Sequence, residues 1–114
     1  MVRLSGILDA GCGQGRTGAA LFAIGHEVIG VDADPVLIAA AVEDHIGPTW
    51  RVQDLSTLTL KSIEQVSLFD AAVLAGNVIT YVAAGTEVQV LSNIRAVLKP
   101  DGFAVVGFHT DRYD

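Results

Sequence analysis

Residues 7–15 of the chain read ILDAGCGQG, and residues 27–32 read EVIGVD. The first stretch is an apolar strand that passes into a loop with three closely spaced glycines, and the second is a strand that ends in Asp32. Glycine lets a loop turn sharply and approach a ligand because it has no Cβ atom. A glycine loop after one strand and an acid after the next are typical of nucleotide sites, where the acid accepts hydrogen bonds from ribose hydroxyls. The pattern therefore predicts a nucleotide-type ligand and leaves its identity open.

Asp9 bears on that identity because it ends the first strand, directly ahead of the loop. We expect its carboxylate to face the ligand, where it would repel a pyrophosphate. S-adenosylmethionine carries a sulfonium, an ammonium and ribose hydroxyls but no phosphate, so it fits an acid on either side of the loop. An NAD-binding Rossmann domain remains an alternative, because residues 13–18 also match the dinucleotide fingerprint and Asp32 lies at about the expected spacing of twenty residues.

At residues 9–15, DAGCGQG, the chain resembles the class I S-adenosylmethionine-dependent methyltransferases, whose first motif is an apolar strand, an acid and Gly-x-Gly-x-Gly. Residues 69–77 look like the fourth motif of this family, and residues 98–102 look like its turn before strand five. The resemblance implies S-adenosyl-L-methionine as the cofactor. The predicted cofactor contacts lie in the loop and after the second, third and fourth strands: Asp9, Ala10, Gly11, Cys12, Gly13, Gly15, Asp32, Ala33, Asp54, Leu55, Ala75, Gly76 and Asn77.

The resemblance also implies roles for the residues that follow strands two and three. Asp54 would accept a hydrogen bond from the adenine amino group, and Leu55 would offer its backbone beside it. Ala33 would pack on the face of the adenine. An acid after a strand is also common turn chemistry, so a purely structural role for Asp54 stays open.

Strand and helix patterns alternate along the chain. We expect strands over residues 5–9, 27–31, 49–53, 68–74 and 103–108, and helices over residues 16–24, 36–43 and 86–98. Asp34 and Pro35 are a start signal, with the acid as N-cap and the proline at the first helical position. Short connections between alternating elements imply right-handed crossovers and a parallel sheet. The fold class is therefore α/β, and the resemblance implies a three-layer Rossmann-like sheet, mainly parallel, with strand order 3-2-1-4-5.

Apolar spacing suggests which faces of the helices are buried. Ala20, Leu21 and Ile24 would form the apolar face of the first helix. The last helix would bury the stripe Val88, Leu91, Ile94 and Leu98. In the expected strand order the loop after strand one and the segment after strand four flank the ligand crevice.

The chain is expected to be one cofactor-binding domain over residues 1–114, truncated before strands six and seven of the family it resembles. A fragment of a longer protein and a naturally short one are both open. The family's later elements help to shape the substrate pocket, so enzyme activity is uncertain and a noncatalytic S-adenosylmethionine-binding or interaction domain is an alternative. The segment 103–108 would be an exposed apolar edge, which predicts a homodimer formed there.

Composition and charge limit the classes of molecule that the chain is expected to bind. The chain has a net charge of −6 and only seven Lys and Arg residues, which disfavours nucleic acid. Its apolar runs fall short of the about 20 residues that a membrane span needs, and we expect no leader and a cytoplasmic location. Residues 75–78 lack the Asn/Asp-Pro-Pro-Tyr/Phe signature of amino-group methylation, so a small-molecule acceptor is the default.

No catalytic residue and no metal site are assigned. Methyl transfer from a sulfonium depends mainly on alignment and exclusion of water, so no catalytic dyad is required. Cys12 is interpreted as a small tolerated side chain rather than a nucleophile. Asn77, Tyr81 and His109 are candidates for orienting an acceptor, each with a plain structural alternative.

Overall fold

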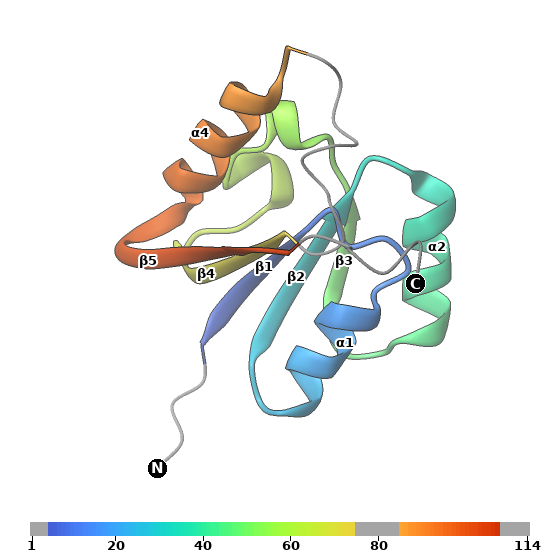
Figure 1. Cartoon of the computed structure of the whole chain (residues 1–114). Helices are drawn as coiled ribbons and strands as arrows, with labels where there is room; N and C mark the ends of the chain where they lie inside the picture. The colour runs from blue at the N-terminus through green and yellow to red at the C-terminus, as the bar shows by residue number, and fades with distance from the viewer. Residues whose placement is uncertain (1–4, 75–84, 108–114) are drawn as a thin grey trace, which may run out of the picture.

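The computed structural model describes residues 5–74 and 85–107. Five parallel strands form one sheet in the order β3-β2-β1-β4-β5 (Figure 1). The elements are β1 (Gly6–Ala10), α1 (Arg16–Ala23), β2 (Glu27–Asp32), α2 (Pro35–Asp44), β3 (Thr49–Val52), the 3-10 turns η1 (Leu55–Thr57) and η2 (Lys61–Ile63), β4 (Phe69–Leu74), α4 (Glu87–Val97) and β5 (Leu98–Val106). The predicted α/β class and strand order are confirmed.

The sheet separates two layers, with α1 and α2 on one side and α4 on the other (Figure 1). The larger core lies on the α4 side, where residues of β1, β4, η1 and η2 pack against Val90, Ile94 and Val97. A smaller cluster of Ile38, Ala41 and Trp50 lies on the side of α1 and α2. Strand β1 is buried from residue 7 to residue 10 because both of its faces are covered, which explains its unbroken apolar run.

Helix α2 begins where the sequence predicts. The carboxylate of Asp34 accepts a hydrogen bond from the backbone N–H of Val36 at 2.9 Å, and Pro35 is the first helical residue. The acid satisfies a backbone donor that the first turn of a helix leaves unpaired. The predicted N-cap is therefore confirmed.

The expected buried faces of two helices are only partly right, since Ile94 and Leu98 contact the core but Val88 and Leu91 are exposed. Helix α4 buries Val90, Ile94 and Val97, whereas the side chain of Val88 is 81% exposed. Both stripes have helical spacing and share Ile94, so periodicity alone does not decide between them. Helix α1 buries Gly18, and Ile24 is 69% exposed.

Strand β5 begins at Leu98, not at Phe103 as expected. Leu98 pairs with Phe69 and Phe103 with Ala71, so the expected turn over residues 99–102 is an irregular part of the strand pairing. Asp70 lies inside this irregularity. Its carboxylate accepts from Lys99 Nζ and from the backbone N–H of Gly6, each at 2.8 Å. These bonds tie the starts of β1, β4 and β5 together.

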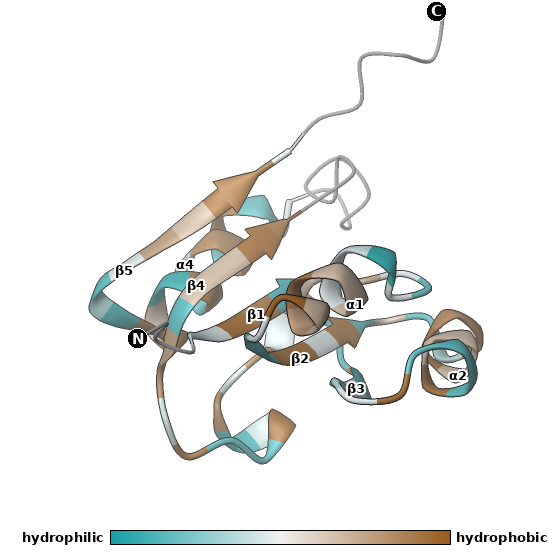
Figure 2. Cartoon of the chain, turned by 90° about the horizontal axis from the view of Figure 1, so that it is seen from below, coloured by the Kyte–Doolittle hydropathy of each residue, from teal (hydrophilic) through white to brown (hydrophobic). Residues whose placement is uncertain are grey.

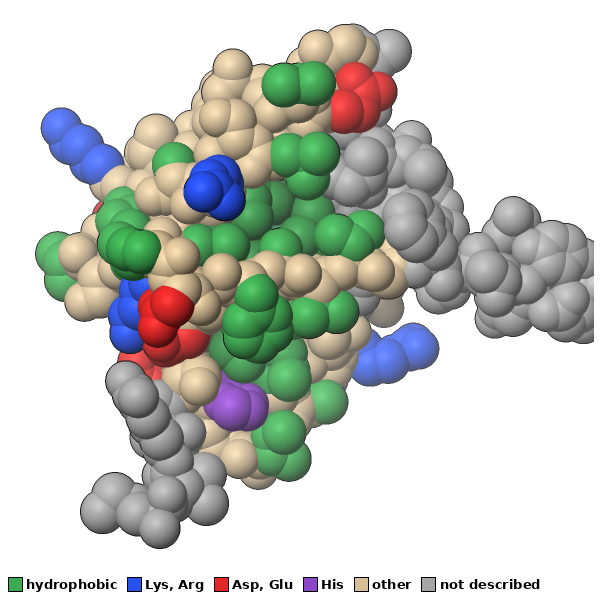
Figure 3. Space-filling model, turned by 60° about the vertical axis from the view of Figure 1, so that its left-hand side comes forward, with side chains coloured by type: hydrophobic (Ala, Val, Ile, Leu, Met, Phe, Trp, Pro, Cys, Tyr) green, Lys and Arg blue, Asp and Glu red, His purple; other side chains and the backbone are tan. Residues whose placement is uncertain are grey.

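The second half of β5 is an exposed apolar edge, as expected. Figure 2 shows β5 as the outermost strand with a hydrophobic second half. Phe103 is 61% exposed and Val105 is 50% exposed. Figure 3 brings forward the side of the molecule that lies on the left in Figure 1, where β5 is. Hydrophobic side chains gather across the middle of this face. Within the described residues, no helix has the length and apolar character needed to cross a membrane.

The orientation of α4 can be tested with two identical substitutions. Val90→Ala should lower the free energy of unfolding by about 2 kcal/mol, because it removes two buried methyl groups from the core. Val88→Ala should change it by less than about 0.5 kcal/mol, because this side chain contacts water. Guanidinium unfolding followed by circular dichroism measures both. Equal costs at the two positions would contradict the observed face.

Candidate functional site

The glycine loop has a backbone that only glycine adopts readily. Gly11, Gly13 and Gly15 have φ angles of 73°, 58° and 91°, in the left-handed region. The loop is joined to the end of β2, because the N–H groups of Gly11 and Cys12 both donate to the carbonyl of Val31 at 2.8 Å. Gly15 N–H donates to the carbonyl of Cys12 at 3.0 Å. The three glycines therefore let the loop fold back on the neighbouring strand.

Asp32 lies beside this loop at the carboxyl end of β2. Its Oδ2 accepts from the N–H of Gly13 and its Oδ1 from the N–H of Asp34, both at 2.9 Å. A carboxylate oxygen has two lone pairs, so each oxygen retains acceptor capacity for a ligand hydroxyl. A Cβ atom built on Gly13 would meet nothing within 4 Å, so this side of the loop is open. The arrangement fits a ribose placed against Asp32.

Asp9 lies under the loop and does not face the open side, which differs from our expectation. It is 1% exposed, and its Oδ2 has no hydrogen-bond partner among the described residues. Burial raises the pKa of Asp9 to about 6; the backbone N–H of Gly18 lowers the pKa and the charge of Asp32 raises it. Side chains alternate along a strand, and at this position they point toward α1. The carboxyl group therefore lies at the start of α1.

Four of the five amides from Gly11 to Gly15 are already paired within the protein. Dinucleotide sites bind pyrophosphate with free loop amides and the N-terminus of the following helix. Here the loop amides of Gly11, Cys12, Gly13 and Gly15 all donate to acceptors within the protein. The carboxyl group of Asp9 lies beside Gly18 in the first turn of α1. The two carboxyl groups at the loop, Asp9 and Asp32, therefore favour a cationic ligand over a phosphate group.

The sequence analysis missed Trp50, which lies beneath the loop. It is directly opposite Gly30 in the register of β2 and β3, and Cβ atoms built on Gly15, Gly18 and Gly30 would come within 2.8, 2.9 and 2.3 Å of its indole. Its Nε1 donates to the carbonyl of His45 at 2.9 Å. A tryptophan beside a strand glycine was the available signal, but it could be interpreted only once the strand register was known.

Cys12 is in the loop with its thiol partly buried. Burial, followed by the charges of Asp9 and Asp32, raises the pKa of this thiol to about 12. The thiolate is the nucleophilic form of cysteine, so a thiol that stays protonated near neutral pH is a poor nucleophile. This supports its interpretation as a small side chain that the loop tolerates.

The remaining predicted contacts are placed less tightly. Asp54 caps η1, and its Oδ1 accepts from the N–H and the Oγ of Ser56, both at 2.8 Å. These two bonds lower the pKa of Asp54. Leu55 is buried, Ala33 is exposed beside Asp32, and Ala10 is buried at the end of β1. Their contacts with a cofactor stay predictions.

Several predicted positions lie outside the described residues. These are Ala75, Gly76, Asn77, Tyr81 and His109. In the described parts of the chain, no group of three or more His, Cys, Asp or Glu side chains could hold a metal ion.

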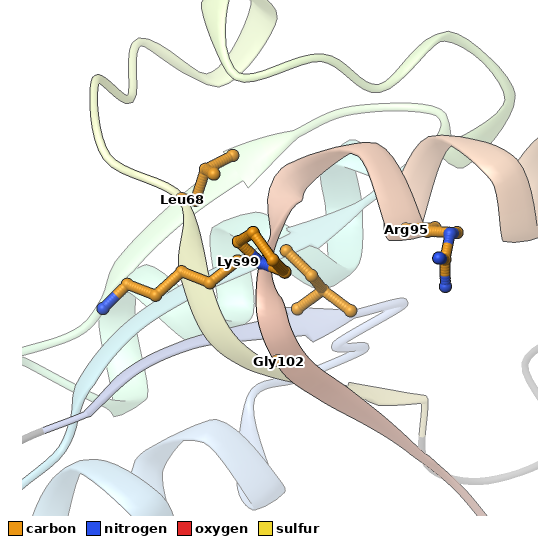
Figure 4. Close-up of a pocket in the computed structure, with 6 residues that line it drawn as sticks. Leu68, Arg95, Lys99 and Gly102 are labelled. Atoms are coloured by element: carbon orange, nitrogen blue, oxygen red, sulfur yellow. The ribbon is translucent and has the colours of Figure 1, made fainter.

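A pocket of about 180 Å³ lies at the opposite end of the sheet from the glycine loop. Its lining residues are Leu68, Arg95, Leu98, Lys99, Pro100 and Gly102. Figure 4 shows the side chains of Lys99 and Arg95 pointing in different directions. Lys99 is paired with Asp70. This pocket is therefore separate from the candidate site and has no converging charges.

Sequence comparison identifies relatives over most of the chain. A family model described as "Methyltransferase domain" matches residues 7–102. The ubiquinone biosynthesis O-methyltransferase of Bradyrhizobium diazoefficiens is 38% identical over 101 residues, which are 88% of this chain and 38% of that protein.

Solved structures with the same fold are also longer than this chain. A TehB-like SAM-dependent methyltransferase from Corynebacterium glutamicum matches with a TM-score of 0.84 and 43% identity, over 98% of this chain and 59% of that one. SAM-bound CalS10, an amino pentose methyltransferase from Micromonospora echinaspora, matches in fold with a TM-score of 0.79 and 24% identity, over 90% of this chain and 42% of that one. The chain thus spans between about two fifths and three fifths of these proteins.

The buried carboxyl group of Asp9 predicts a pH-dependent stability. Its pKa is raised from 3.8 to about 6, so the folded chain retains a proton that the unfolded chain has released. The stability from this proton is complete below about pH 4 and is lost as the pH rises through about 6. Asp9→Asn should therefore raise the free energy of unfolding at pH 7.5 by about 3 kcal/mol and leave it nearly unchanged at pH 4.

Guanidinium unfolding at the two pH values measures this difference. Asp44→Asn, which removes an exposed negative charge from α2, is the matched control and should have a small effect at both. A destabilised Asp9→Asn variant at pH 7.5 would show that the ionised form is favoured by the fold, contrary to the prediction.

Proposed function

Because the chain belongs to the methyltransferase domain family, we propose that it is the S-adenosylmethionine-binding core of a methyltransferase of the class I type, formed as a single domain. The observation that carries this proposal is the negative charge at a loop whose amides at Gly11, Cys12, Gly13 and Gly15 are paired within the protein. They donate to Val31, Asp32 and Cys12, while Asp9 and Asp32 supply negative charge below and beside the loop. S-adenosylmethionine suits this arrangement because it is cationic and has no phosphate.

The predicted site residues divide between the parts of the cofactor in the proposed complex. Asp32 accepts hydrogen bonds from the ribose hydroxyls, and the loop backbone from Gly11 to Gly15 covers the methionine end of the cofactor. Ala33, Asp54 and Leu55 form the adenine side. Ala75, Gly76 and Asn77, which lie outside the described residues, are proposed as further cofactor contacts. When bound, the cofactor supplies a methyl group activated by its sulfonium, so the protein has to align the acceptor and exclude water.

We propose a small molecule as the methyl acceptor. The relatives support this, because one acts in ubiquinone biosynthesis and another on an amino pentose. The net charge of −6 disfavours a nucleic acid acceptor. A cytoplasmic location, suggested by the single cysteine, stays a prediction.

We also propose that the chain forms a homodimer through β5. An edge strand presents unpaired backbone groups, and here it also presents apolar side chains on both of its faces. Pairing with the same strand of a second copy satisfies the backbone groups and buries Phe103, Val105 and Val106 together. Apolar edges of this kind are normally covered in proteins that remain dispersed.

Calorimetric titration tests the cofactor. The chain should bind S-adenosylmethionine and S-adenosylhomocysteine, and Asp32→Ala should weaken both by roughly 10- to 150-fold because it removes charge-assisted ribose contacts. Asp34→Ala is the matched control. This variant removes the side chain of a nearby exposed acid, which caps α2. It should leave both dissociation constants unchanged. Binding of NAD without binding of S-adenosylmethionine would refute the proposal in favour of a dinucleotide site.

Turnover is tested separately, with radiolabelled S-adenosylmethionine and a panel of small-molecule acceptors. Methyl transfer that depends on the chain and is weakened by Asp32→Ala would support an enzyme. Cofactor binding without transfer to any acceptor would instead favour the noncatalytic binding domain.

The dimer has its own prediction. Light scattering at tens of micromolar should give twice the monomer mass, and Val105→Lys should return the chain to a monomer because it places a charge on the paired edge. Val66→Lys, at an exposed position away from β5, is the matched control and should leave the dimer intact. A monomeric wild-type chain at this concentration would refute the interface.

A further inference from the structure

Trp50 occupies a space that exists because three of its neighbours lack a side chain. Gly15 lies in the loop, Gly18 in the first turn of α1 and Gly30 in β2, and a Cβ atom on any of them would lie within 3.0 Å of the indole. Real Cβ atoms do not approach other atoms so closely. The indole is therefore in contact with the glycine loop, with the helix that follows it and with the strand on which it rests.

The indole is also held in a single orientation. Its Nε1 donates at 2.9 Å to the carbonyl of His45, the C-cap residue that follows α2. Its ring packs with Ile38 and Ala41 of α2, and the side chain of Cys12 packs against the same cluster from the loop. A rigid group anchored to β3 and α2 thus supports the loop from below.

We propose that Trp50 is a positioning residue for the glycine loop. It holds the loop in the position in which the Gly13 N–H group donates to Asp32 on the ligand side. The effect on ligand binding rests on the proposed function, because it assumes that the cofactor contacts this loop and Asp32. The glycines have no side chains that could fill the space of the indole. A smaller side chain at position 50 therefore lets the loop move toward β3. Displacements of about 1 Å in a binding constellation cost much of its affinity.

A size exchange between Trp50 and Gly30 tests this support. Gly30→Ala places a methyl group 2.3 Å from the indole and must displace it, whereas Trp50→Leu removes the support and leaves a cavity. In the double variant the added methyl group partly fills the space left by the indole. Each single variant should weaken S-adenosylhomocysteine binding at least tenfold, and the double variant should bind more tightly than either. Thr49→Ala, exposed on the same strand, is the control and should bind like wild type.

A second readout follows the loop without a ligand. Cys12 is the only cysteine of the chain, so its alkylation by iodoacetamide reports how well the loop packs on Trp50. In Trp50→Leu the rate should rise at least tenfold and stay constant at low urea, because the loop opens locally without unfolding. A purely structural role predicts a rate that increases with urea as global unfolding does.

The two readouts separate the possible failures. Wild-type affinity in Trp50→Leu, or alkylation that follows only global unfolding, would overturn the role of Trp50. A wild-type chain that binds neither S-adenosylmethionine nor S-adenosylhomocysteine would overturn the proposed function, while the urea dependence of alkylation would still decide whether Trp50 positions the loop.

Discussion

The hydrogen bonds between the glycine loop and the end of β2 are the interaction on which the rest of the site depends. The carbonyl of Val31 accepts from two loop residues and the carboxylate of Asp32 accepts from a third, Gly13. The bonds require a backbone that crosses the left-handed region three times within five residues. Because the loop is closed on the protein itself, a ligand meets a preformed surface, and little ordering of the loop opposes binding.

The charges beside this loop favour a cationic ligand over a phosphate group. Two carboxyl groups lie at the loop, Asp9 buried beneath it and Asp32 half-buried beside it. The charge of each raises the pKa of the Cys12 thiol, and the charge of Asp32 raises that of Asp9. Burying an ionised acid lowers the stability of the fold, and such local costs are typical of binding sites. Here it accompanies an electrostatic field that favours a sulfonium.

Local patterns predicted the parts of the fold that local chemistry controls. The N-cap at Asp34 and the parallel order of the strands follow from residue types and spacing, and the structure confirms them. The buried face of α4 was not predictable in this way. The stripes through Val88 and through Val90 both fit a helix, and the core formed by β4, η1 and η2 selects the second. In the same way, the irregular pairing of β4 and β5 was not predictable, and Asp70 within it accepts hydrogen bonds from Gly6 of β1 and Lys99 of β5.

The sequence by itself determined the alternation of strands and helices, the glycine loop and the acids that accompany it, because periodicity, caps and turn residues act over a few neighbouring positions. Only the tertiary structure decided that Asp9 lies under the loop and that Trp50 supports it. Both facts depend on strand register, which places Trp50 opposite Gly30, twenty residues earlier in the chain. Register arises from the packing of whole elements. The role of a strand glycine such as Gly30 can therefore be recognised only when the residue opposite it on the neighbouring strand is known.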